Sequence, residues 1–251
     1  MSSHFAKPEN ALSKAQTLVS IGKPSAALKT LQGILSARRY RLWTPTHEEI
    51  MYLYIQVAVG LRRNVKDALL QYRMICQPTQ MASLERVMRR YQQTAEEKAN
   101  EAQAKAAEAT AAESTVSIDV DDLEEDSPES IMLAAMSGEG TKERLDRQIL
   151  TPWVKYLWEC YRTILETLRN NGRLELLYHQ TARAAFNFCK RFQRNMEFRR
   201  LCEILRNHLI TITKFQNQSN AIDLNSPETQ KLYLETRFQQ LKMAADLELW
   251  Q

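Results

Sequence analysis

The sequence predicts an all-α fold and, more narrowly, a right-handed α-solenoid of helical hairpins. Its 251 residues include only 6 Gly and 7 Pro, whereas the strong helix formers Ala, Leu, Glu, Gln and Arg are abundant. Apolar residues recur at steps of three and four along most of the chain, as on one face of a helix. Polar turns separate these periodic segments roughly every 15 to 25 residues, a spacing typical of stacked antiparallel helices.

Two helical hairpins are expected at the N-terminus. In the first, Gly22 provides the turn between two amphipathic helices. Ala27-Leu28 of the first hairpin and Ala68-Leu69 of the second occupy equivalent places, 41 residues apart, which is a repeat-like spacing. A small Ala at the crossing point allows two helices to approach closely, as tetratricopeptide-like units require. The four helices are expected to begin near residues 8, 24, 45 and 65.

The remaining helices follow from Ser/Thr-Pro starts and apolar periodicity. Ser127-Pro128, Thr151-Pro152 and Ser226-Pro227 each place a capping residue before a Pro at the first helical position. Further helices are expected over residues 83–95, 131–136, 151–168, 174–189, 198–212 and 227–249.

Charge divides the chain into three expected parts. Residues 1–95 hold 14 Lys/Arg and 5 Asp/Glu (net +9), and residues 144–251 hold 17 and 11 (net +6), whereas residues 96–143 hold 3 and 14 (net −11). Residues 96–113 lack large apolar side chains, so we expect a helix extension without a buried face, followed by an acidic flexible linker. The predicted division is a helical-repeat part at 1–95, this connector at 96–126 and a second helical-repeat part at 127–251.

The basic parts indicate an anionic partner such as RNA or a ribonucleoprotein surface. Five arginines at the expected ends of the second and third helices are candidate contacts with the ribosome or RNA. Near them, Trp43 interleaves with basic residues as in a stacking platform for bases. The structural interpretation, which we favour, is that the arginines complement a helix C-terminus and Trp43 packs in the core. The candidates are Arg38, Arg39, Arg41, Arg62 and Arg63.

No sequence feature indicates an enzyme. The chain has no G-x-G-x-x-G or P-loop pattern, and His47-Glu48-Glu49 has Met51 where a zinc protease needs its second His. The acidic run 119–126 lacks the turn Gly of a calcium loop, and the four Cys form no C-x-x-C pair. We therefore expect no catalytic residue, no metal and no cofactor. With no long apolar run and no signal peptide, the expected location is the cytoplasm, without membrane contact.

Several longer stretches resemble the N-terminal part of the largest (a-type) subunits of eukaryotic translation initiation factor 3. They occur in order along the whole chain, and words of this length are specific. These stretches are Phe5 with Pro8–Leu12, Pro128–Glu139, Leu150–Glu159, Glu197–Cys202, Asn217–Ser219 and Glu248–Gln251.

The resemblance implies helical repeats that lead toward a PCI domain and a charged helical tail, neither of which we expect within these 251 residues. It also implies a scaffold that assembles with other subunits of the factor, chiefly the c subunit, and contacts the small ribosomal subunit near the mRNA exit. A helical module that binds rRNA or mRNA directly through a basic patch is the alternative. A helical regulator unrelated to the ribosome is a third interpretation, which the resemblance disfavours.

Overall fold

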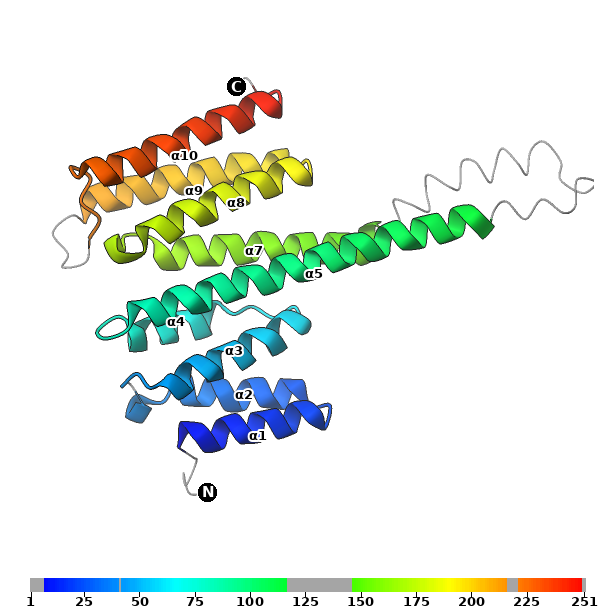
Figure 1. The fold of residues 1–251 in the computed structure, drawn as a ribbon, viewed down its shortest axis with the longest axis vertical. Helices are drawn as coiled ribbons and strands as arrows, with labels where there is room; N and C mark the ends of the chain where they lie inside the picture. The colour runs from blue at the N-terminus through cyan, green and yellow to red at the C-terminus, as the bar shows by residue number, and fades with distance from the viewer. Residues whose placement is uncertain (1–6, 41, 117–145, 216–220, 250–251) are drawn as a thin grey trace, which may run out of the picture. The chain divides into compact units, whose positions relative to one another are not determined.

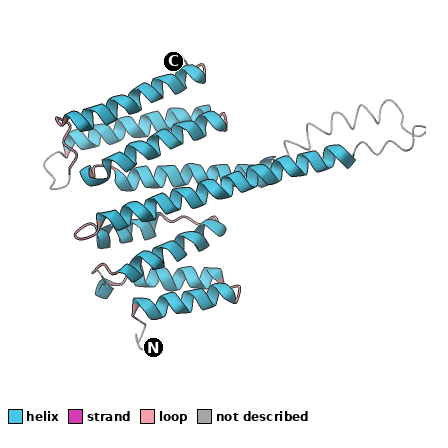
Figure 2. Ribbon diagram, in the orientation of Figure 1, coloured by secondary structure: helices cyan, strands magenta, loops and turns pink. Residues whose placement is uncertain are grey.

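The computed structural model describes residues 7–40, 42–116, 146–215 and 221–249. The described residues form helices, turns and loops without a strand, which confirms the all-α helical-repeat fold (Figures 1 and 2). No helix among them is long and apolar enough to cross a membrane. The expected helix at 131–136 and the acidic linker lie outside the described residues.

The chain forms two compact units. The first contains residues 1–94 and 158–251, and the second contains residues 95–157. The first unit therefore combines helices from both sides of the expected connector. The proposed division at 1–95, 96–126 and 127–251 remains a prediction.

The N-terminal helices of the first unit stack in the order of the sequence. They are α1 (Pro8–Ser20), α2 (Pro24–Leu35), the short 3₁₀ helix η1 (Arg38–Tyr40), α3 (Pro45–Gly60) and α4 (Lys66–Cys76). Helix α1 packs on α2 and α3, and α2 also packs on α3 and α4. Contact with both the next helix and the one after it is the packing of a helical-repeat stack. As expected, Ala27 and Ala68 are both buried.

Helix α5 (Met81–Val116) is 36 residues long and continues from the first unit into the second. The expectation that residues 96–113 bury no face is wrong. Ala99, Ala102 and Ala106 are 0%, 3% and 3% exposed, and together with the buried Ala95 they form one stripe at steps of four, three and four. Large apolar side chains are a poor guide to this stripe, because alanines bury a face through close backbone approach.

The C-terminal helices complete the first unit. The π-helix η2 (Asp146–Leu150) precedes α7 (Thr151–Leu168), which begins in the second unit and ends in the first. The 3₁₀ helix η3 (Gly172–Leu174), α8 (Glu175–Arg191), α9 (Asn195–Lys214) and α10 (Pro227–Asp246) follow, and α8 packs on both α9 and α10. Lys66 Nζ of α4 lies 2.7 Å from Glu166 Oε2 of α7, so residues 100 positions apart meet.

Several helix ends are closed by a left-handed residue that is not glycine. Gly22 ends α1 with φ +78°, but Arg62, Gln193 and Glu248 adopt φ of 52°, 51° and 55° after α3, α8 and α10. After Arg62, the amide of the next residue donates to the Ala58 carbonyl at 2.8 Å, the long bond that closes a helix C-terminus. A chain poor in glycine thus ends these helices with residues strained in this conformation.

Replacing Arg62 with Gly is expected to raise the free energy of unfolding by about 1 kcal/mol, because glycine adopts a positive φ without the steric cost of a Cβ. The neighbouring Arg63→Gly variant is the control and should be destabilised, since its φ is not positive and glycine only adds backbone entropy. Urea unfolding followed by circular dichroism measures both. Equal effects of the two variants would show that the Arg62 backbone is not strained.

Candidate interaction surfaces

The five candidate arginines do not form one patch. Arg38 and Arg39 belong to η1, where the Arg39 side chain is exposed, and Arg41 lies outside the described residues. Arg62 and Arg63 follow the C-terminal end of α3 and are exposed. Helix α3 has 16 residues, about 24 Å at 1.5 Å per residue, and η1 lies near its other end (Figure 1). The described arginines therefore occupy two surfaces, and their contact with ribosome or RNA remains a prediction.

Trp43 takes part in a hydrogen-bonded network inside the stack. It is half-buried, and its Nε1 donates to Tyr72 Oη of α4 at 3.4 Å. Tyr72 Oη lies 2.6 Å from Ser83 Oγ of α5, and both residues are fully buried. This arrangement agrees with the structural interpretation of Trp43, because a ring held against Tyr72 is not a platform for a base.

Glu48 extends this network to the surface. Its carboxylate accepts hydrogen bonds from Ser83 Oγ, from Tyr52 Oη at 2.7 Å and from Arg86 Nε and Nη2 at 2.8 and 2.7 Å. The hydrogen bonds from Arg86, followed by those from Ser83 and Tyr52, outweigh burial and lower the pKa of Glu48 to about 2. Helices α3, α4 and α5 are thus connected by one polar chain that sequence spacing did not reveal.

The histidines connect helices in the same way. His47 Nδ1 accepts from the Thr44 amide at 3.2 Å at the start of α3. His179 Nδ1 lies 2.7 Å from Thr236 Oγ1, and His208 Nδ1 lies 3.0 Å from Tyr178 Oη. Burial lowers the pKa of His179 and His208 to about 4. Within the described ranges, no three His, Cys, Asp or Glu side chains come together as metal ligands would.

An apolar stripe on α10 faces solvent. Leu234, Phe238 and Leu241 follow one another at steps of four and three, and they are 56%, 67% and 64% exposed. Thr236 and Met243, on the other side of this helix, are buried, and α10 packs on α8. Helix α10 therefore has two faces with apolar residues, of which one is covered in this unit. The leucines of this helix were expected from the sequence, but their division between two faces was not.

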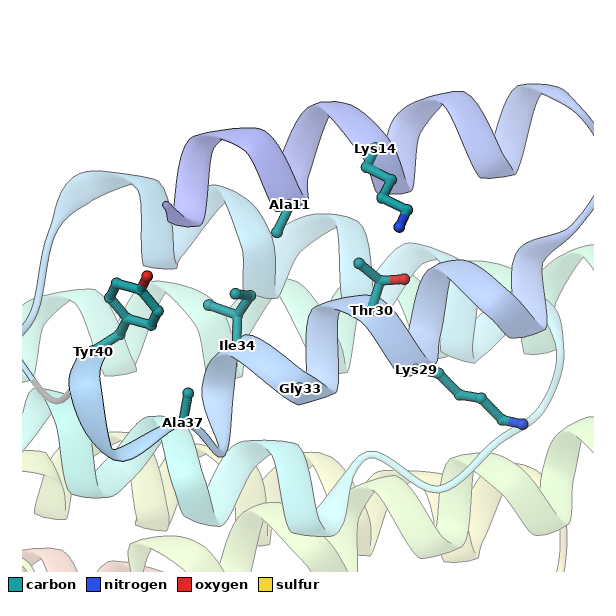
Figure 3. Close-up of a pocket in the computed structure, with 8 residues that line it drawn as sticks. All are labelled: Ala11, Lys14, Lys29, Thr30, Gly33, Ile34, Ala37 and Tyr40. Carbon is teal, nitrogen blue, oxygen red and sulfur yellow. The ribbon is translucent and has the colours of Figure 1, made fainter. Parts of the chain in front are cut away.

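Two grooves of about 400 Å³ each lie on the first unit. One lies among α4, α7 and α9 and is lined by polar and charged groups, including the Lys66–Glu166 ion pair and His208. The other, called here the N-terminal groove, has a largely apolar lining (Figure 3). Its lining residues are Ala11 and Lys14 of α1, Lys29, Thr30, Gly33 and Ile34 of α2, and Ala37 and Tyr40 beyond α2.

Comparison with known proteins identifies the family. Residues 9–251 match the family model described as eIF3a, PCI domain, TPR-like region. The chain is 49% identical over 250 residues to the eIF3a protein of Nicotiana tabacum, the largest component of eukaryotic translation initiation factor 3, covering 98% of this chain and 26% of the relative. It is 48% identical over 251 residues to the eIF3a protein of Arabidopsis thaliana, covering 99% and 25%.

The human eIF3a protein is 45% identical over 254 residues, covering all of this chain and 18% of the relative. The chain thus spans between about a sixth and a quarter of the length of these curated relatives. High identity over essentially the whole chain agrees with the helical-repeat fold described above. The chain belongs to the eIF3a family of eukaryotic translation initiation factor 3, and it corresponds to a helical-repeat portion of such a protein.

Proposed function

We propose that this chain is a non-enzymatic scaffold module of translation initiation factor 3 that acts in the cytoplasm. It assembles with other subunits of the factor, chiefly the c subunit, and contacts the small ribosomal subunit near the mRNA exit. The relatives are named as subunits of an initiation factor, which supports membership of a larger assembly. The named partners rest on the family resemblance.

The exposed stripe on α10 is the observation that carries the scaffold proposal. Leu234, Phe238 and Leu241 expose more than half of their surface on one helix face. Contiguous apolar surface of this kind marks a protein contact, because a partner that covers it removes apolar area from water. The partner expected on this face belongs to the rest of the factor, which in the relatives includes most of the eIF3a protein itself.

The scaffold proposal is tested by replacing all three stripe residues with Ser and measuring capture of the rest of the factor by the tagged 251-residue chain. The variant should lose capture while its helical circular dichroism is unchanged, since exposed side chains contribute little to folding. A matched variant with Leu176, Met196 and Ile210 changed to Ser carries three exposed apolar residues of α8 and α9 and should bind normally. Unchanged capture by the stripe variant would contradict the role of α10.

Direct RNA binding is the second candidate function. It is favoured by the exposure of Arg39, Arg62 and Arg63 and by the net charge of +9 over residues 1–95. Because the described arginines form two surfaces, RNA would have to contact each of them separately. Two shorter sets of phosphate contacts replace the single patch that the sequence suggested.

If these surfaces contact rRNA phosphates, binding to small ribosomal subunits should weaken with salt, with a log–log slope of roughly −0.7 to −0.9 per phosphate contacted. Replacing Arg38, Arg39 and Arg41 with Ala, or Arg62 with Gly and Arg63 with Ala, should each make the slope shallower without lowering helicity. Gly is used at position 62 because its φ is 52°. A slope near zero, or slopes unaffected by both variants, would assign these arginines a structural role only.

A further inference from the structure

We propose that the N-terminal groove between α1 and α2 binds an amphipathic acidic helix of a partner protein. The inference rests on the proposed scaffold function and deepens it, because it names the chemistry of one partner. It starts from the shape of the groove, its charge and a glycine that the chain's own packing does not require.

The floor of the groove is apolar and low. Ala11 of α1 faces Ile34 of α2, and Gly33 and Ala37 add little or no side chain (Figure 3). Small residues on a helix surface let another helix approach closely, since interaxial distance depends on the side chains at the contact. A groove of about 400 Å³ with this floor suits the apolar face of an incoming helix.

The surroundings of the groove are positively charged. Lys14 and Lys29 line it and are exposed, and its lining includes no Asp or Glu. Residues 7–40 contain six Lys or Arg and a single acidic residue, Glu9. An occupant with Asp or Glu beside its apolar face would complement this charge, which favours association and selects against basic partners.

Gly33 is the observation that points to a close approach. It lies inside α2, where glycine is unfavourable relative to alanine, and it is exposed. Its φ is not positive, and a Cβ built on it would meet nothing within 4 Å. Neither backbone conformation nor packing within the described chain therefore requires glycine at this position. The close approach of another backbone would require it.

The lining favours a protein helix over RNA. Tyr40 is the one aromatic side chain among the lining residues, and none of them is an arginine. Single-stranded RNA is bound by basic grooves in which successive bases stack on aromatic side chains. A floor of alanine, glycine and isoleucine beside two lysines instead matches apolar and acidic residues that alternate around a helix.

The test uses the 251-residue chain and a displayed library of random 16-residue peptides. Peptides retained by the wild type are depleted on a Gly33→Leu variant, whose side chain fills the groove. The recovered peptides should be rich in Asp and Glu and should have apolar residues at helical spacing. Recovery of no peptides, or of peptides without acidic bias, would overturn the proposal.

The affinity of a recovered peptide is then measured by fluorescence anisotropy. Replacing both Lys14 and Lys29 with Ala should weaken binding by about tenfold, whereas a charge-matched variant with Lys7 and Lys23 changed to Ala should bind normally, since neither lysine lines the groove. Equal loss in both double variants would show a general charge effect and contradict a built site.

Gly33→Ala separates binding from folding. It should raise Tm by about 2 °C, because alanine favours the helix, and should nevertheless weaken peptide binding by about threefold. Gly60→Ala, the control, also adds a Cβ in open space but lies at the end of α3 outside the groove, and it should leave binding unchanged. Unchanged binding by Gly33→Ala would contradict the proposed close approach.

A 12-nucleotide single-stranded RNA is the competing probe. If it binds the wild type and is lost in Gly33→Leu, the occupant is RNA and the helix proposal is wrong. Failure of the peptide experiments leaves capture of the factor through α10 unaffected, so the two proposals can fail separately.

Discussion

Replacing Glu48 with Ala is expected to lower the free energy of unfolding by about 3 kcal/mol. The carboxylate joins α3 to α5 through Ser83 and Arg86, and it also accepts a hydrogen bond from Tyr52. Ser83 is fully buried, so its removal from this network is not compensated by water. Urea unfolding monitored by circular dichroism gives the change.

Glu49→Ala is the matched control, because Glu49 is the next residue on the same helix and is exposed. Its effect should stay within about 0.5 kcal/mol. Similar losses in the two variants would show that helix propensity or general charge, and not the network, determines the effect.

The same network makes a prediction about acid. Since the pKa of Glu48 is lowered from 4.5 to about 2 in the folded chain, its contribution is fully present above about pH 4.5 and is lost as the pH falls toward 2. Its size is about 2–3 kcal/mol, less than the full shift implies because Arg86 is half exposed. The Glu48→Ala variant should lose less stability over this range than the wild type.

Phe186→Ala is expected to cost about 4 kcal/mol, the second large effect, because it leaves a cavity in a packed core. Phe186 of α8 is fully buried, and its ring centroid lies 5.7 Å from that of Phe198 of α9. The loss should therefore loosen the contact between these helices. Thermal and urea unfolding of the variant measure it.

Phe238→Ala makes the same chemical change on α10, where the side chain is 67% exposed, and should have little effect on stability. It should instead weaken capture of the rest of the factor, since Phe238 belongs to the exposed stripe. A large loss of stability in Phe238→Ala would show that this face is covered within the chain and is not a contact surface.

Local sequence patterns predicted most of the helices because their information is local. The turn at Gly22, the Pro-initiated helices and the buried Ala27 and Ala68 all follow from neighbouring residues. The buried face of α5 did not, because alanines at 99, 102 and 106 carry little hydrophobic signal. The left-handed Arg62 was missed for a similar reason, since a non-glycine residue gives no sign of a positive φ.

The candidate surfaces depended on distances that the sequence does not contain. Arg39 and Arg62 are close in sequence, yet the straight length of α3 separates the surfaces to which they belong. Conversely, Glu48 and Arg86 are 38 residues apart and hydrogen-bonded, and Lys66 pairs with Glu166. The two-sided α10 was visible in principle, because its apolar residues fall on two faces of a helical projection.

Binding to purified small ribosomal subunits, with and without the remaining components of the factor, tests the scaffold role most directly. The tagged 251-residue chain is mixed with each preparation, and cosedimentation is measured alongside the α10 stripe variant. We expect the wild-type chain to cosediment with the small subunit, the rest of the factor to increase this association, and the stripe variant to lose the increase. A wild-type chain that associates with neither the small subunit nor the rest of the factor would contradict the scaffold role.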